Sequence, residues 1–289
     1  NRALRSCHAT MSFFFGGDEK GATVAPTAHG LGLVAAQDLK AQDIVFSETP
    51  VLSARLSDAF ATPAFLARPD VSKIVDALGA VEEKHGHEAE DEAYPEAAKT
   101  LIDDLSELHV LERVAKLDAA GAAKVWALED AFREARPGDA VEVEGLTSAA
   151  GAALNGARGA VVGADGDRLA VELPGGRKSI KGAHLKTLRG VLRTNSLREG
   201  DYGVHVFERL SRLNHACGPA ANVSTAFVTM PDGDRVCGVV ATRDVAAGAE
   251  LLADYGGAAR RHLPGAARRA WLFRNYGFVC ACAHCQSGA

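Results

Sequence analysis

Three cysteines lie close together near the end of the sequence, at Cys280, Cys282 and Cys285. This CxCxxC spacing presents three thiolates from one tight turn, whereas a structural zinc ion takes four tetrahedral ligands. The fourth ligand must come from elsewhere, and the candidates are Cys217 and His284. We prefer Cys217, because His284 would crowd against the adjacent Cys285. The alternative is a set of ordinary buried or redox-active thiols, and we favour an intracellular zinc site.

The composition is that of a folded globular chain. Its 289 residues are 47% hydrophobic and 24% charged, which argues against disorder or a fibrous repeat. The length suits one large domain or two small ones. Apolar runs such as residues 159–164 fall far short of the roughly 18 residues of a membrane span, so we expect no membrane partner. The net charge of -5 disfavours a protein that works mainly through phosphate contacts and favours a basic partner.

The six cysteines are too few and too unevenly placed for a secreted disulfide scaffold, so we expect a nuclear or cytoplasmic protein. The chain begins with Asn1, and Met11 is an equally good natural start. We therefore treat residues 1–22 as an N-terminal tail. Cys7 and Cys237 carry no signal of chemistry, and Cys237 lies in a strand-like run typical of a core.

Four regions of different pattern follow the tail. Residues 23–55 contain short β-type runs broken by glycine, which predict two or three strands. Residues 56–136 carry alanine, leucine, glutamate and lysine at helical spacing, which predicts a helical insertion. Its acidic part, residues 82–104, is typical of a solvated helix face or a mobile loop. Between residues 137 and 189, short alternating strands return, separated by turns that contain glycine.

The 137–189 region predicts a small β-barrel, because four or five short strands fit into it. The run from Leu154 to Gly159, followed by a β-type segment, resembles the small SH3-like barrels of the KOW kind. Basic residues gather toward its end, at Arg177, Lys178, Lys181, Lys186 and Arg189. Few aromatic residues accompany them, so we favour a solvated edge, or docking against the acidic helical block, over nucleic-acid binding.

After residue 190 the β-type runs resume, and a helical stretch at residues 260–275 precedes the cysteine-rich end. A β-rich frame thus opens before residue 55 and closes after residue 190. We predict an α+β, mostly β, domain that the insertion splits into residues 23–55 and 190–277. The C-terminal segment, residues 278–289, would carry the zinc ligands.

Four sequence motifs occur in order along this frame. They are Gly30-Leu31-Gly32-Leu33-Val34-Ala35, Arg212-Leu213-Asn214-His215-Ala216-Cys217, Gly248-Ala249-Glu250-Leu251-Leu252-Ala253-Asp254-Tyr255-Gly256 and Asn275-Tyr276-Gly277-Phe278-Val279-Cys280-Ala281-Cys282. Together they resemble a SET-domain protein lysine methyltransferase of the SMYD-like branch, without its cysteine-rich MYND finger. The resemblance covers about residues 23–52 and 190–286. It implies small sheets with a knot-like crossing, interrupted by the helical insert and the barrel, and a zinc-binding post-SET segment.

The resemblance also implies S-adenosylmethionine as the cofactor. In the family the GxG segment, here Gly30, Leu31 and Gly32, wraps the cofactor, and glycine lets the backbone approach a ligand closely. The Asn-His pair contacts it too. Asn214 would hydrogen-bond the amino acid or adenine part, and His215 would hold the adenine side through its ring or backbone.

Two further positions match cofactor contacts of the family. The segment that contains Asn195 resembles the TNxF segment of SMYD-like proteins, although Leu197 replaces the usual aromatic residue. Phe278 matches the position whose ring packs on the adenine. A zinc ion bound by Cys217 and the C-terminal cysteines would pin this segment against the cofactor loop.

Tyr255 matches the catalytic tyrosine of the family, and the resemblance also places it among the residues that contact the cofactor. Methyl transfer from a sulfonium is an in-line displacement, so the enzyme must align a neutral lysine amine and exclude water. Free lysine has a pKa of about 10.4, which a nearby sulfonium cation and an apolar channel would lower. The Tyr255 hydroxyl would orient the amine, and its role is chiefly geometric because a phenol is a poor base at neutral pH.

The leading function is therefore an S-adenosylmethionine-dependent protein-lysine N-methyltransferase that acts on a histone tail or another protein. One departure from the family affects this prediction. The asparagine that should follow Cys217 and Pro219 closely is displaced by two residues, to Asn222. Either Asn222 bulges back into place or that contact is missing, and activity would then be lower. The alternative function is an inactive SET protein that binds protein or nucleic acid through its barrel.

Overall fold

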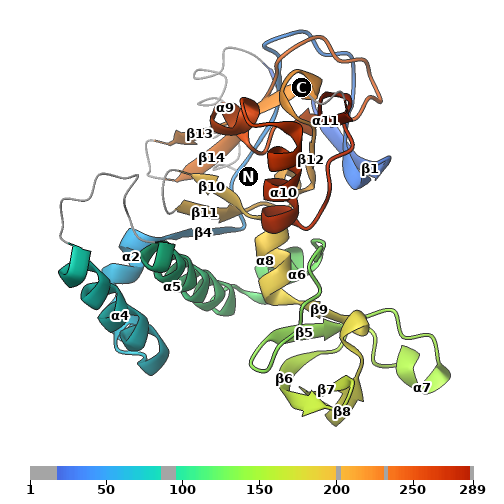
Figure 1. Ribbon diagram of the computed structural model, residues 1–289. Helices are drawn as coiled ribbons and strands as arrows, with labels where there is room; N and C mark the ends of the chain where they lie inside the picture. The colour runs from blue at the N-terminus through green and yellow to red at the C-terminus, as the bar shows by residue number, and fades with distance from the viewer. Residues whose placement is uncertain (1–17, 86–95, 200–202, 231–233, 287–289) are drawn as a thin grey trace.

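The computed structural model describes residues 18–85, 96–199, 203–230 and 234–286. Within them, strands form small sheets, and an insertion of helices and a further sheet separates the first part of the chain from the last (Figure 1). The fold is mixed α and β, as the sequence predicts. None of the described helices is long and apolar enough to cross a membrane.

The first part of the chain forms the strands β1 (Ala22–Thr27), β2 (Gly30–Ala35), β3 (Ile44–Glu48) and β4 (Leu52–Arg55). β1 and β2 make an antiparallel hairpin. Its turn requires glycine, because Gly30 has a φ of +100°. The sequence predicted two or three strands, and β4 was too short to be recognised from its pattern.

The predicted helical insertion follows. It comprises α2 (Leu56–Phe60), α3 (Pro63–Leu66), α4 (Pro69–His85), α5 (Glu96–Ala115) and α6 (Ala119–Trp126). α2 to α5 pack together around Phe65, Val71 and Leu105, which are almost fully buried. Part of the acidic stretch, residues 86–95, lies outside the described residues.

The 137–189 region forms a five-stranded antiparallel sheet with the order β8-β7-β6-β5-β9. Its elements are β5 (Ala140–Val143), α7 (Ala149–Ala152), β6 (Arg158–Asp165), β7 (Arg168–Leu173), β8 (Gly176–Ile180), the 3-10 turn η2 (Gly182–His184) and β9 (Leu185–Thr187). Valine, leucine and isoleucine side chains give the sheet a core of its own. The number of strands agrees with the prediction, and closure into an SH3-like barrel stays a prediction.

Two of the basic residues noted in the sequence attach this sheet region to its neighbours. Arg189 forms an ion pair with Glu107 of α5. Lys186 is buried, and its Nζ lies 2.7 Å from the carbonyl oxygen of Trp126 at the end of α6. Docking against the helical block therefore accounts for part of the basic stretch.

The last part of the chain completes the frame. Its elements are α8 (Leu188–Asn195), β10 (Leu197–Glu199), β11 (Gly203–Val206), η3 (Leu210–Arg212), β12 (Asn214–His215), η4 (Gly218–Ala220), β13 (Val223–Thr229), β14 (Arg235–Ala241), β15 (Leu252–Ala253), α9 (Gly257–Arg261), α10 (Gly265–Tyr276) and α11 (Ala283–Gln286). The strands among these elements form two sheets with β3 and β4, in the orders β10-β11-β4 and β12-β15-β13-β14-β3. Strands from before and after the insertion thus pair directly.

The helix α8 was not foreseen, because the sequence analysis assigned no element between residue 190 and the β-type runs that resume after it. Thr187 caps the helix by accepting a hydrogen bond from the Gly190 amide. Leu188, Val191 and Leu192 are buried at helical spacing. The strands of the 137–189 region, immediately before the helix, hid this short periodic run.

Candidate active site and metal centre

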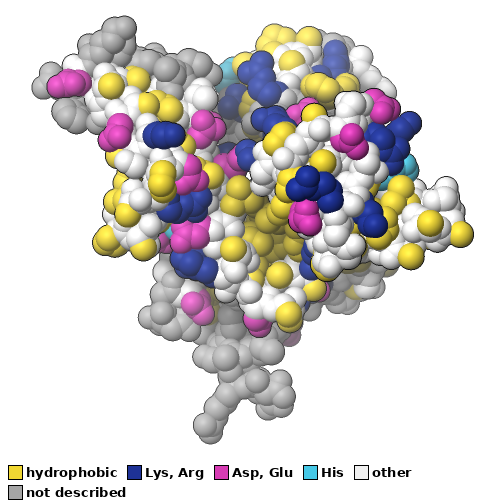
Figure 2. Space-filling model, turned by 90° about the horizontal axis from the view of Figure 1, so that it is seen from below, with side chains coloured by type: hydrophobic (Ala, Val, Ile, Leu, Met, Phe, Trp, Pro, Cys, Tyr) yellow, Lys and Arg dark blue, Asp and Glu magenta, His cyan; other side chains and the backbone are white. Residues whose placement is uncertain are grey.

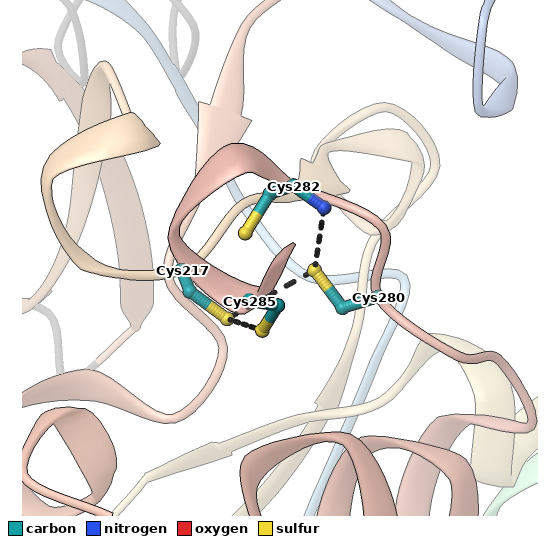
Figure 3. Close-up of side chains that lie close together, drawn as sticks. All are labelled: Cys217, Cys280, Cys282 and Cys285. Carbon is teal, nitrogen blue, oxygen red and sulfur yellow. Dashed lines mark hydrogen bonds between the residues drawn. The ribbon is translucent and has the colours of Figure 1, made fainter. Parts of the chain in front are cut away.

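The four cysteines predicted as metal ligands meet at one point in the structure. The sulfurs of Cys217, Cys280, Cys282 and Cys285 all lie within 4.8 Å of one another. Figure 3 shows their side chains turned toward a common centre, with Cys217 approaching from the loop after β12. The Cys217 sulfur lies 3.4 Å from that of Cys285 and 3.9 Å from that of Cys280. The other candidate ligand, His284, is not a member of this cluster.

This arrangement fits a tetrahedral zinc ion. Zinc–sulfur bonds of about 2.3 Å at tetrahedral angles place the sulfurs about 3.8 Å apart, close to the distances above. Burial raises the pKa of the Cys217 thiol, and neighbouring thiols raise it further. Thiolates packed this closely are stable only around a cation, and a bound metal ion supplies that charge.

Buried positive charge lies beside the cluster. Arg268 of α10 is buried, and contact with the sulfurs of Cys285 and Cys217 raises its pKa even though burial acts in the opposite direction. A zinc ion with four thiolates keeps a net negative charge, which a guanidinium offsets. The backbone amide of Cys282 also donates to the Cys280 sulfur at 3.5 Å. These contacts supply the surroundings that a tetrathiolate site requires.

Gly277 directs the C-terminal chain from α10 into the cluster. The helix ends there because Gly277 adopts a φ of +77°, and its amide donates to the carbonyl of Phe273. A Cβ at this position would also lie 2.9 Å from the Cβ of Ala131. Glycine is therefore required both by the backbone conformation and by the close packing. The chain then places Phe278 and Cys280 beside Tyr255 and Cys217.

Tyr255 lies in a group of aromatic rings. Its ring centre is 4.7 Å from that of Tyr276, 5.0 Å from that of His215 and 6.2 Å from that of Phe278. The hydroxyl donates to the backbone carbonyl of Leu213. Burial raises the pKa of Tyr255 above its ordinary value, so the phenol stays protonated at neutral pH. A protonated phenol can form hydrogen bonds but is a poor base.

His215 is buried between the cysteines and Tyr255. Its Nδ1 accepts a hydrogen bond from the Tyr255 backbone amide at 3.1 Å, and its Nε2 lies 3.1 Å from the Cys217 sulfur. Burial lowers the pKa of His215 to about 4, so the ring is neutral at pH 7. Both ring nitrogens are engaged inside the protein.

The predicted cofactor hairpin packs directly on Asn214. A Cβ on Gly32 would lie 2.5 Å from the Asn214 Nδ2, so only glycine permits this approach. The same Nδ2 donates to Glu250 Oε1 at 2.9 Å, and the other oxygen of Glu250 lies 2.9 Å from His29 Nδ1. Gly30 and Leu31 are exposed on the hairpin. The structure thus brings together Gly32 of the first motif, Asn214 of the second and Glu250 of the third.

Asn195 and Asn222 hold the frame in ways the sequence did not reveal. The Asn195 Nδ2 donates to the carbonyls of Glu129 and Val191, which fixes the end of α8. Asn222 is buried; its side-chain Nδ2 donates to the Glu250 carbonyl, and its Oδ1 accepts from the Leu252 backbone amide. The displaced asparagine therefore bridges to the segment that leads to Tyr255.

A cavity of about 180 Å³ opens at Tyr255. Leu197 and Arg198 of β10 line it, as do Thr225 and Phe227 of β13. Tyr276, Asn195 and Leu213 also contribute to its walls. A second cavity of about 390 Å³ shares Ser196, Arg198 and Tyr276 with it, so the hollow continues between α5, α8 and α10.

Three residues at the site carried no assignment from the sequence. Tyr276 packs on Tyr255 with the two rings tilted by 51°. Glu250 accepts a hydrogen bond from Asn214, and Asp254 accepts hydrogen bonds from the Gly218 amide and Arg261. Tyr276, Glu250 and Asp254 all lie within the quoted motifs. Their positions in those motifs could have marked them as site residues. The direction in which each side chain points could not be predicted from the sequence.

The chain belongs to the SET-domain family. The model of that family, described as "SET domain", matches residues 30–256, which is most of the sequence. The match ends before the C-terminal cysteines. A search of curated proteins found no match.

Two solved structures are similar to this chain. One is a SET domain of LSMT bound to lysine and AdoHcy, with 12% identity and a TM-score of 0.39 over 95% of this chain. The other is Rubisco LSMT bound to sinefungin and monomethyllysine, with 11% identity and a TM-score of 0.35 over 96% of this chain. The chain spans just over half of each, 57% and 56% of their lengths.

Proposed function

We propose that the protein is an S-adenosylmethionine-dependent protein-lysine N-methyltransferase. Membership of the SET-domain family supports this, and one structural observation carries it. Tyr255, with its hydroxyl held by the Leu213 carbonyl, lies at a cavity lined by the edges of two strands, β10 and β13. A protonated phenol keeps an oxygen lone pair that can accept from a lysine amine placed in this cavity. Alignment of the amine is the main requirement of methyl transfer.

The cofactor would lie against the hairpin and Asn214. When bound, it supplies a methyl group on a sulfonium. Because the Asn214 Nδ2 donates to Glu250, its Oδ1 remains as an acceptor for the ammonium group of the cofactor. Gly32 lets the hairpin pack directly on Asn214, and Phe278 offers a ring face for the adenine. Zinc on the four cysteines would hold Phe278 in place by fixing the chain that follows it.

The substrate would be a protein segment in extended conformation. Beyond Val223, β13 pairs only with β14 among the described strands, and residues Ser224 to Ala226 are exposed. β10 pairs only with β11 in the same part of the structure. A peptide backbone added along these edges would direct one lysine side chain toward Tyr255.

The continuation of the cavity carries charges of both signs. Asp103, Asp104 and Glu107 of α5 line it together with Arg198 and Arg274. Arg198 forms an ion pair with Asp103. Figure 2 likewise shows acidic and basic side chains interspersed on the face seen from below, around a hollow with hydrophobic side chains on its floor. A mixed surface suits a protein segment better than a nucleic acid, which favours a continuous basic stripe.

The test is transfer of labelled methyl from S-adenosylmethionine to a protein mixture by the parent and by Tyr255→Phe. We expect label on lysine with the parent and a loss on the order of 100-fold with the variant. Binding of S-adenosylhomocysteine should be unchanged, because the Tyr255 hydroxyl donates its proton to the Leu213 carbonyl and has none to donate to the cofactor. No transfer by a metal-loaded parent that binds the cofactor would leave the alternative, a SET protein that only binds.

A further inference from the structure

His215 lies between two features that the proposed function treats separately. They are the cluster of four cysteines and Tyr255, the proposed catalytic residue. Its Nδ1 is 3.1 Å from the Tyr255 backbone nitrogen, and its Nε2 is 3.1 Å from the Cys217 sulfur. The side chain is only 5% exposed and Cys217 is 3% exposed, so solvent does not compete for either contact.

The chemistry of the partners determines where the ring proton lies. A backbone amide can only donate, so Nδ1 must accept and the proton of the neutral ring is on Nε2. Nε2–H then points at Cys217. The Ala253 backbone also interacts with this ring. The opposite tautomer would place a proton on Nδ1, where the Tyr255 amide also points its proton, and would require Cys217 to donate to Nε2. A metal-bound thiolate has no proton to donate, so a metal ion selects the first tautomer.

We propose that His215 is a positioning residue that couples the metal centre to Tyr255. It donates Nε2–H to the Cys217 thiolate and accepts the Tyr255 backbone amide on Nδ1. The catalytic meaning of this bridge rests on the proposed function, whereas the bridge itself does not. Asn and His are adjacent in β12, so the strand that presents Asn214 to the cofactor also links the metal ligand to the tyrosine.

The bridge has two consequences for the site. A hydrogen bond to a ligating sulfur orients that ligand, and loss of such a partner typically weakens metal binding about 10- to 100-fold. The ring also lies 5.0 Å from Tyr255 and 5.8 Å from Phe278 between ring centres, so its orientation determines how both rings pack. With both nitrogens engaged, the backbone of His215 remains for contact with a cofactor.

Two substitutions separate the two bonds. The amide of Asn falls near the position of Nδ1, so His215→Asn can still accept from Tyr255 but does not reach Cys217. The amide of Gln falls near Nε2, so His215→Gln can still donate to Cys217 but not accept from Tyr255. The control is His109→Gln, because His109 is a buried histidine of α5 that packs on Phe65 away from the cysteines.

The first measurement uses the full chain loaded with Co²⁺, because the sulfur-to-metal charge-transfer band reports electron density on the ligating sulfurs. The second follows hydrogen exchange of the Tyr255 backbone amide by NMR. We expect His215→Asn to move the band to longer wavelength and to lower metal affinity about tenfold, with Tyr255 exchange unchanged. We expect His215→Gln to keep the band and to speed Tyr255 exchange about tenfold. The control should change neither.

Three results would each overturn the proposal. The charge-transfer band could stay unshifted in His215→Asn, Tyr255 amide exchange could stay unchanged in His215→Gln, or His109→Gln could show effects as large as those of the two His215 variants. If a variant does not fold, nitrogen NMR of the metal-loaded parent decides, since a proton on Nδ1 of His215 is incompatible with the bridge. None of these measurements requires methyl transfer. If the variants show the expected band shift and exchange rates but the protein transfers no methyl group, only the proposed function is overturned. If the protein transfers methyl groups but the variants do not show these effects, only the bridge is overturned.

Discussion

Gly32 lies so close to Asn214 that any side chain at position 32 would displace the Asn214 amide. A Cβ there would lie 2.5 Å from the Asn214 Nδ2 and 3.1 Å from Glu250 Oε1. The contact connects the β1–β2 hairpin to the strand that leads to His215 and Cys217. It is the point at which the first part of the chain joins the proposed cofactor site.

Gly32→Ala should therefore push Asn214 away from the hairpin. Overpacking of this kind typically costs about 1–3 kcal/mol in the free energy of unfolding. We expect about tenfold weaker binding of S-adenosylhomocysteine, measured by calorimetry, with a lower melting temperature. Gly163→Ala in β6 is the matched control, since nothing lies within 4 Å of its Cβ position. Equal binding by Gly32→Ala and the parent would contradict the placement of the cofactor.

A bulky residue at Thr225 should obstruct the substrate and spare the cofactor. Thr225 is exposed on β13 and lines the cavity at Tyr255. We expect Thr225→Trp to raise KM for the protein substrate about tenfold, because about 1.4 kcal/mol of substrate binding would be lost. Affinity for S-adenosylhomocysteine should not change. Thr229→Trp, exposed on the same strand but outside the cavity lining, should behave like the parent, and a similar rise in its KM would argue against the strand-edge path.

Removal of the metal should destabilise the protein and weaken cofactor binding together. We expect zinc in the purified protein and its loss in Cys285→Ser, because a tetrahedral site needs all four thiolates. The melting temperature should fall as it does when the parent is treated with a chelator. Cys237→Ala removes a buried thiol away from the cluster and should keep its zinc. A zinc content in Cys285→Ser equal to that of the parent would contradict the site.

The Glu250 contacts predict an acid-sensitive hairpin. Burial would raise the pKa of Glu250, but hydrogen bonds from Thr27, Asn214 and His29 outweigh it and hold the pKa below its ordinary value of 4.5. A group whose pKa is lower in the folded state stabilises the protein above its unfolded pKa, and that contribution is lost as pH falls through the folded value.

The corresponding measurement is the melting temperature of the parent and Glu250→Gln between about pH 7 and pH 3. Glu250→Gln should be less stable at pH 7, and the difference should shrink as the pH falls below about 4.5. Glu172→Gln, which alters an exposed carboxylate paired with Arg177, should show little difference at any pH. A constant gap between the parent and Glu250→Gln would show that this carboxylate does not titrate with folding.

Much of the fold was predictable because it depends on local patterns. The helical insertion, the strands of the 137–189 region and the helix before the cysteines all follow from periodicity and turn residues over a few neighbouring positions. β4 and α8 were missed for the opposite reason. β4 is only four residues long, and α8 follows strands directly, so neither offers a window in which its period stands out.

The order of the four motifs and the cysteine triplet can be read directly from the chain, because residues close in the chain are held together by covalent geometry. That Cys217 joins the triplet while His284 does not depends on the folded arrangement. The folded arrangement also decides that His215 turns one nitrogen to that sulfur and the other to Tyr255, and that Glu250 holds Asn214. These contacts join segments far apart in the chain, and their geometry depends on how the sheets pack and on which polar groups burial forces to find partners.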